Sequence, residues 1–149
     1  MVSKSQEEYL KTIYILQKQN GKVRVTDIAN KMRLTKAGVC KAVKALKEHG
    51  FVNCQVYGTI KLTYEGESLA KKILEKYDIV FIFLRDVIEL EEDEAKIEAE
   101  KIKLVMSDNT INQLAKYVHE TLGFYSLDCG YNVNNEKCRT CLRRKHAEI

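Results

Sequence analysis

Three cysteines and a histidine near the C-terminus have the clearest potential for chemistry. A Cys-x2-Cys pair can place two thiolates on one metal ion, and a third nearby thiolate adds a further ligand. His146 or His119 can supply the fourth position of a tetrahedron. The metal ligands that we predict are Cys129, Cys138, Cys141 and His146. Such a set suits zinc or an iron–sulfur cluster, with zinc preferred.

Two simpler interpretations of this segment stay open. The cysteines can be chance features of a loose tail, or Cys138 and Cys141 can form a thiol redox pair. The chain begins with polar residues and lacks an apolar signal segment, so we expect a cytoplasmic protein with reduced thiols. Its longest apolar run, residues 79–84, is far shorter than the roughly 20 residues of a membrane-spanning helix, and no membrane partner is expected.

Nothing in the sequence indicates an enzyme. The seven glycines are scattered and form no phosphate-binding loop. No Ser or Cys lies in a sequence context typical of an activated nucleophile. The histidines are isolated: His49 is expected at a helix end, and His119 on a helix surface.

Composition and charge favour a helical protein with one basic part. The 149 residues are 45% hydrophobic and 31% charged, which is typical of a globular chain and excludes wholesale disorder. Proline is absent, which favours long helices. Residues 1–65 hold twelve Lys or Arg against five Asp or Glu, whereas the remainder is mildly acidic. This asymmetry suggests a polyanionic partner on one side, with a solvated lysine-rich surface as the alternative.

The first half of the chain has the element order of a winged helix-turn-helix. Apolar spacing predicts a helix over 4–19. Thr26 and Thr35 are the predicted N-caps of a brief second helix and of a third helix, which ends at His49-Gly50. Residues 51–62 change to an alternating pattern and predict a hairpin that turns at Tyr57-Gly58.

The second half predicts helices that bury apolar residues. A long helix capped by Thr63 should run to about residue 89, and its run 79–84 is apolar all round, so we expect burial on more than one side, with a second copy as a cover. Helices are expected over 91–106 and after Ser107. The fold class is mainly α, a winged helix-turn-helix followed by a helical dimerisation region. The predicted domains are residues 1–63 for DNA binding, 64–123 for dimerisation and 124–149 as a Cys-rich tail.

The third helix and the wing are the predicted DNA-binding elements. A helix fits the major groove, and the outer face of this one is rich in lysine. Early exposed positions lack Arg, Asn and Gln, so direct base discrimination should be modest. The predicted DNA contacts are Thr26, Thr35, Lys36, Ala37, Gly38, Cys40, Lys41, Lys44, Tyr57 and Lys61. The alternative is a winged-helix module that contacts proteins and does not bind specific DNA.

Four stretches of the sequence carry a family resemblance. They are Glu7-Glu8-Tyr9-Leu10-x-x-Ile13-Tyr14, Val23-x-Val25-Thr26-Asp27-Ile28-Ala29, Val39-x-x-x-Val43-x-x-Leu46-x-x-x-Gly50-Phe51-Val52 and Leu62-Thr63-x-x-Gly66-x-x-Leu69-Ala70. Together they resemble the metal-dependent repressors of the diphtheria toxin repressor and manganese transport regulator type. The resemblance implies a homodimer that represses genes of metal homeostasis by binding palindromic operators in double-stranded DNA. We predict a repressor linked to metal or redox homeostasis that senses through its C-terminal cysteines.

The resemblance breaks down at the family's metal site. Manganese-regulator-type members bind the activating metal with an acidic pair on helix one, a His on the long helix, and a Glu plus a Glu-His pair on the next helix. The corresponding residues here are Glu8, Lys11, Tyr77, Glu100, Lys103 and Leu104. Two carboxylates and two lysines suit a transition metal poorly, so we expect no manganese or iron there. Instead, Lys11 and Lys103 should pair with Glu8 and Glu100, an ammonium standing in for the metal, with ordinary surface ion pairs as the alternative.

Overall fold

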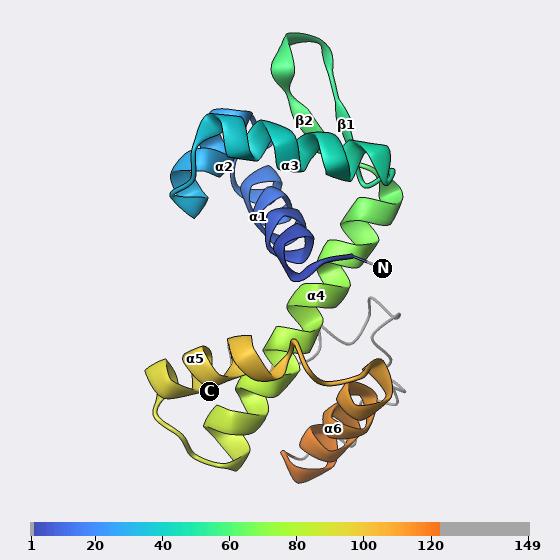
Figure 1. The fold of residues 1–149 in the computed structure, drawn as a ribbon. Coiled ribbons are helices and arrows are strands. Elements are labelled where there is room, and N and C mark those ends of the chain that lie inside the picture. The colour runs from blue at the N-terminus through green and yellow to red at the C-terminus, as the bar shows by residue number, and fades with distance from the viewer. Residues whose placement is uncertain (1, 123–149) are drawn as a thin grey trace. The chain divides into compact units, whose positions relative to one another are not determined.

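The computed structural model describes residues 2–122 of the chain. The predicted ligands Cys129, Cys138, Cys141 and His146, and the predicted tail domain, lie outside the described residues. The chain divides into two compact units, residues 1–73 and 74–149. Over the described residues, Figure 1 shows a mainly helical chain with a two-stranded hairpin, β1 and β2. The predicted fold class, mainly α with a winged helix-turn-helix, is confirmed.

The first unit is a three-helix core with a wing. Its elements are α1 (Lys4–Asn20), α2 (Val25–Met32), α3 (Lys36–Glu48), β1 (Val52–Cys54), β2 (Ile60–Leu62) and the start of α4 (Tyr64–Ile82). Leu10 and Ile13 of α1 and Val39 and Leu46 of α3 are fully buried together. Burying four such side chains stabilises the unit, since each contributes about 1.5–3 kcal/mol of transfer free energy.

Local caps set where most helices begin. The hydroxyl of Ser3 accepts a hydrogen bond from the Gln6 N–H at 3.2 Å, and the Ser3 N–H donates to the Gln6 side chain at 3.0 Å. Thr35 Oγ1 accepts from the Gly38 N–H at 3.1 Å, as predicted. Each such cap contributes about 1 kcal/mol.

The predicted Thr26 cap is wrong. α2 begins at Val25, and the Arg24 N–H donates to Oδ2 of Asp27 at 2.8 Å. The reason is non-local: Val23 accepts a 2.7 Å hydrogen bond from the Ile60 N–H in an isolated antiparallel bridge, which ends the extended segment early. Thr26 therefore lies inside the first turn of α2 and is exposed.

The wing is the antiparallel hairpin that was expected. Val52 is opposite Leu62, and Cys54 is opposite Ile60. The connection is a single 3-10 turn over Val56–Gly58 in which Tyr57 has a φ of 72°, in the left-handed region. The predicted turn at Tyr57-Gly58 is confirmed.

The second unit packs the end of α4 with a π-helical turn (Phe83–Val87), α5 (Glu92–Ile102) and α6 (Asp108–Thr121). Ile79, Val80, Ile82 and Leu84 are all buried within a single chain, so the expected burial of this apolar run is confirmed, whereas the second copy expected as its cover is not required. The helix was predicted to run to residue 89, but α4 ends at Ile82 and the π-helical turn follows it directly. Within residues 2–122, no helix combines the length and apolar character needed to cross a membrane.

Candidate nucleic-acid interface and family metal positions

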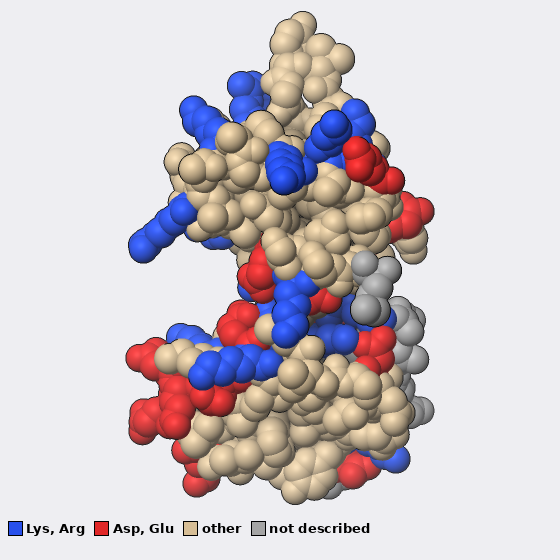
Figure 2. All heavy atoms as spheres, in the orientation of Figure 1, with Lys and Arg blue, Asp and Glu red and all other residues tan. Residues whose placement is uncertain are grey.

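One face of α3 is buried and the opposite face is basic. Val39, Val43 and Leu46 point into the core of the first unit. All the predicted contacts on this helix are exposed, namely Lys36, Ala37, Gly38, Cys40, Lys41 and Lys44, and so are Lys47 and Glu48. Figure 2 shows many Lys and Arg side chains on the unit that carries the wing, and a gathering of acidic side chains on the other unit. The structure therefore brings the predicted helix contacts onto one exposed face.

The α3 lysines are electrostatically available. Lys18 and Lys71, elsewhere in the same unit, both approach Glu67. Among the described residues, by contrast, no ion pair involves the four α3 lysines, which are Lys36, Lys41, Lys44 and Lys47. Cationic side chains without carboxylate partners favour an anionic surface such as a phosphate backbone.

Small residues at the start of α3 allow close approach. Ala37, Gly38 and Cys40 are exposed and present little side-chain bulk. A Cβ on Gly38 would lie 3.1 Å from Oγ1 of Thr35, so a larger residue would crowd the cap that starts the helix. The N-terminus of α3, which carries the positive end of the helix dipole, is thereby left open to a phosphate.

The wing places aromatic and basic groups near its tip. Tyr57 is 87% exposed at the turn, and Lys61 is exposed on β2 opposite Asn53. Val56, which was not among the predicted contacts, is 79% exposed beside Tyr57. The exposure of Val56 could have been predicted, because an apolar residue inside a turn has no facing strand to pack against.

Two of the positions that the resemblance assigns to the family's metal lie in the first unit and form an ion pair. Lys11 Nζ lies 2.8 Å from Oε2 of Glu8, and the two residues share one face of α1. The Lys11 side chain is only 16% exposed, against 41% for Glu8. The predicted pair is confirmed, and it is more buried on the lysine side than an ordinary surface pair.

Three further family positions come together in the second unit. Lys103 Nζ lies 2.5 Å from Oε2 of Glu100, and its side chain is 3% exposed. The same ammonium lies 5.7 Å from the centroid of the Tyr77 ring, a cation–π distance. The predicted Lys103–Glu100 pair is thus confirmed, whereas Leu104 is 37% exposed and takes no part in it.

Aromatic stacking connects this cluster to the end of α4. The Tyr77 ring is parallel to the Phe81 ring, with 5.9 Å between centroids. The Arg85 guanidinium lies 4.8 Å from the Phe81 centroid. Positions 77, 81 and 85 share one helix face, so Tyr77 is held in a defined position beside Lys103.

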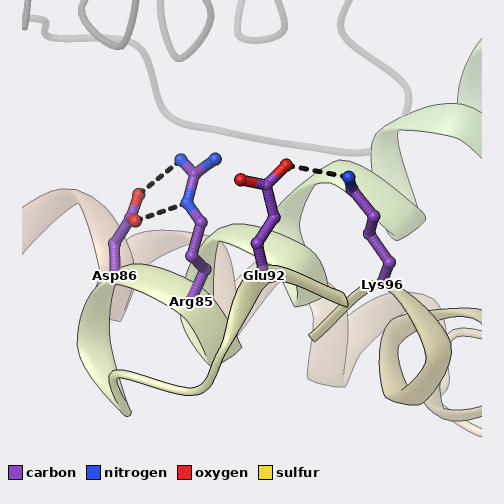
Figure 3. A network of polar contacts seen from close by, with 4 residues as sticks. All are labelled: Arg85, Asp86, Glu92 and Lys96. Carbon is purple, nitrogen blue, oxygen red and sulfur yellow. Dashed lines mark hydrogen bonds and ion pairs between the residues drawn. The ribbon is translucent and has the colours of Figure 1, made fainter. Parts of the chain in front are cut away.

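A polar network surrounds the π-helical turn and the start of α5 (Figure 3). Arg85 donates to both carboxylate oxygens of Asp86, at 2.6 and 2.9 Å, and this hydrogen bonding raises the pKa of Arg85. Glu92 pairs with Lys96 at 2.8 Å, and the hydrogen bond lowers the pKa of Glu92 and raises the pKa of Lys96. Each of these two pairs thus joins an acidic to a basic side chain.

His119 was expected on a helix surface, and this prediction is wrong. It lies on α6 and is only 8% exposed, because it follows Ala115 by four residues on the buried face. Burial lowers the pKa of His119, so the imidazole is neutral at pH 7.

The described residues do not suit a metal at the family positions. No three His, Cys, Asp or Glu side chains in residues 2–122 are close enough together to bind one ion. An ammonium brings positive charge in place of a lone pair, and a tyrosine ring lacks the imidazole nitrogen that coordinates a metal. Lys11, Lys103 and Tyr77 therefore replace potential ligands with groups that repel or fail to coordinate a divalent cation.

The fold and the basic face define a winged-helix transcriptional regulator. Residues 1–60 match the family described as "Iron dependent repressor, N-terminal DNA binding domain", and residues 63–121 match "Iron dependent repressor, metal binding and dimerisation domain". The chain belongs to this family of metal-dependent DNA-binding transcriptional repressors, whose members are regulators and not enzymes.

Individual relatives agree with this assignment. The chain is 33% identical over 80% of its length to an HTH-type transcriptional regulator of Methanocaldococcus jannaschii, covering 96% of that protein. It is 30% identical over 79% of its length to the HTH-type transcriptional regulator MntR of Lysinibacillus sphaericus, covering 84% of it. The solved structure of the manganese regulator SloR matches 76% of the chain with a TM-score of 0.67 and 30% identity. The match covers 53% of SloR, so the chain spans about half of that longer protein.

Proposed function

We propose that the protein is a homodimeric repressor that binds a palindromic operator in double-stranded DNA through α3 and the wing of each protomer. The observation that carries this proposal is the exposed α3 face, where lysines without ion-pair partners flank small residues. In this scheme residues 1–63 bind DNA, residues 64–123 dimerise, and residues 124–149 form a metal or redox module.

Exposed apolar residues of the second unit support dimerisation. Five large side chains among the described residues of this unit remain accessible in a single chain: Ile88, Ile97, Leu104, Val105 and Tyr117 are 48%, 57%, 37%, 79% and 53% exposed. Surface of this kind is available for burial against a second copy. Sedimentation of the purified chain should give twice the monomer mass, and a monomer at micromolar concentration would contradict the proposal.

Operator selection tests DNA binding. Purified full-length chain should enrich a palindrome from random duplexes, because two identical protomers read two related half-sites. Affinity for that palindrome should fall steeply with salt, as phosphate contacts require. A chain that enriches no sequence and instead retains a protein partner would favour the alternative, a winged-helix interaction module.

We further propose that the signal reaches the protein through its C-terminal cysteines. The support is their number, their spacing and the chemistry of thiolates, which prefer zinc and iron–sulfur clusters. Metal analysis and a visible spectrum of anaerobically purified protein, compared with Cys138→Ser, test this. About one zinc per chain, or iron with sulfide absorbance, lost in the variant, supports the site. Wild-type protein that contains neither would remove it.

A further inference from the structure

We infer that the Lys103 ammonium occupies the place where the family binds its activating metal, so that operator binding needs no divalent cation at this site. The inference rests on the proposed function, since operator DNA is one of its readouts. It concerns the second unit alone and involves three residues: Tyr77, Glu100 and Lys103.

Lys103 is a buried lysine. Lysine is among the residues least often buried, and it is buried chiefly when its charge is compensated. Here the Lys103 side chain is 3% exposed, and its ammonium lies 2.5 Å from the Glu100 carboxylate and 5.7 Å from the centroid of the Tyr77 ring. Both partners are electron-rich and converge on one cationic point.

A second pair on the same helix shows that this burial is specific. Lys101 and Glu98 have the same i,i+3 spacing on α5, but their side chains are 68% and 41% exposed and lie 3.3 Å apart. That pair is an ordinary surface ion pair of small energetic value. Lys103 differs because it follows Ala95 and Ala99 by eight and four residues, on the face where both alanines are fully buried.

Tyr77, like Lys103, stands where the resemblance places a metal ligand, and it too suits an ammonium better than a metal. A tyrosine ring offers a negative face to an ammonium but lacks the lone pair with which an imidazole coordinates a metal. Stacking on Phe81 holds the Tyr77 ring in place. Tyr77 and Lys103 therefore favour a tethered ammonium over a divalent ion at this site, and the Glu100 carboxylate forms an ion pair with that ammonium.

The first test compares operator binding by protein dialysed against buffer without added metal with binding in excess Mn²⁺. Wild-type Kd values should agree within about threefold. Tightening by Mn²⁺ of about tenfold or more would overturn the inference while leaving the proposed function intact. If the protein selects no operator under either condition, the proposed function fails, and the second test then decides on the inference alone.

The second test uses thermal unfolding of the full chain and needs no DNA. Tyr77→His combined with Lys103→Glu should gain a Mn²⁺-dependent rise in Tm, because an imidazole and a second carboxylate now join Glu100. Wild-type protein and the matched control Lys101→Glu should show none. Thiolates prefer softer metals, so Mn²⁺ also avoids the tail cysteines. A Mn²⁺-induced rise in the Tm of wild type, or none in the folded double variant, would overturn the inference.

A milder variant covers the case in which the double variant does not fold. Lys103→Met keeps an apolar stem of similar length and removes only the charge, so operator affinity should fall about tenfold or more with the helical circular dichroism retained. Lys101→Met should leave affinity unchanged. If Lys103→Met binds the operator as tightly as wild type, the charge is not required and the inference is wrong.

Discussion

Replacing Lys41 and Lys44 by alanine should reduce the salt dependence of operator binding without loss of fold. The two lysines are three residues apart on the exposed face of α3, and neither has an ion-pair partner among the described residues. Alanine is the best helix former, so the substitutions should not weaken α3 itself. The variant therefore isolates the electrostatic contribution of this face.

The expected magnitude follows from the number of phosphates neutralised. Each contact contributes about 0.9 to the slope of log K against log salt, and a dimer presents two copies of α3. If Lys41 and Lys44 each neutralise one phosphate, the slope should become shallower by roughly 3.6. Raising salt from about 50 to about 200 mM should then cost wild type roughly a hundredfold more affinity than it costs the variant.

Fluorescence anisotropy with a labelled operator measures both slopes directly. The matched control is Lys101→Ala with Lys116→Ala, which removes the same charge from exposed positions of the second unit. An unchanged slope in a folded α3 variant that still binds the palindrome would refute the assignment of α3 as the DNA-facing helix. An equal change in the control would show that net charge, and not the α3 face, is responsible.

Three other predictions concern stability. Gly66→Ala should destabilise the protein by about 1–3 kcal/mol in urea unfolding, since a Cβ there would overlap the Phe51 carbonyl oxygen, whereas Ser68→Ala on the same helix should be neutral or slightly stabilising. Burial lowers the pKa of His119 below its ordinary value of 6.5, so on acidification the unfolded state binds a proton before the folded state does. The free energy of unfolding should therefore fall as the pH drops below 6.5. The fall should be smaller in His119→Gln, which has no imidazole to protonate. Asp27→Ala should cost about 1 kcal/mol by removing the α2 cap, measured in the same urea assay.

Elements with local signals could be predicted from the sequence. Ser3, Thr35 and Ser107 are capping residues followed by apolar residues at helical spacing, and each begins the helix expected of it. The hairpin turn was equally local, because Gly58 follows the exposed Tyr57. The predicted i,i+3 pairs of the family metal positions also formed, since helical spacing alone brings such side chains together.

Features that depend on distant packing could not be predicted. The Thr26 cap failed because Val23 pairs with Ile60, far along the chain. The apolar spacing of α4 continues past Ile82 and gives no sign of the π-helical turn, in which the Ile88 N–H bonds to the Phe83 carbonyl, five residues back. The burial of Lys103 did have a sequence signal, because Lys103 follows the apolar Ala95 and Ala99 at four-residue spacing. A charged residue is ordinarily expected at the surface, so this signal was not used.

The Lys103 ammonium and the C-terminal cysteines together bear on how the activity of the repressor is regulated. A bound metal leaves its site when its concentration falls, whereas an ammonium tethered to α5 cannot leave. With Lys103 in that role, this cluster supplies no signal, and the regulatory input has to act elsewhere. The C-terminal cysteines are the place in the sequence whose ligands select soft or borderline metals.

Operator binding by wild type should therefore respond to zinc, iron or oxidants but not to Mn²⁺. Replacing Cys129, Cys138 and Cys141 together by serine should abolish that response and leave DNA binding itself intact. The comparison is made by titrating the labelled operator with each protein in the presence of each metal in turn. A response to zinc that survives in the triple variant would place the sensor outside the tail, and a response to Mn²⁺ that survives would return it to the family positions.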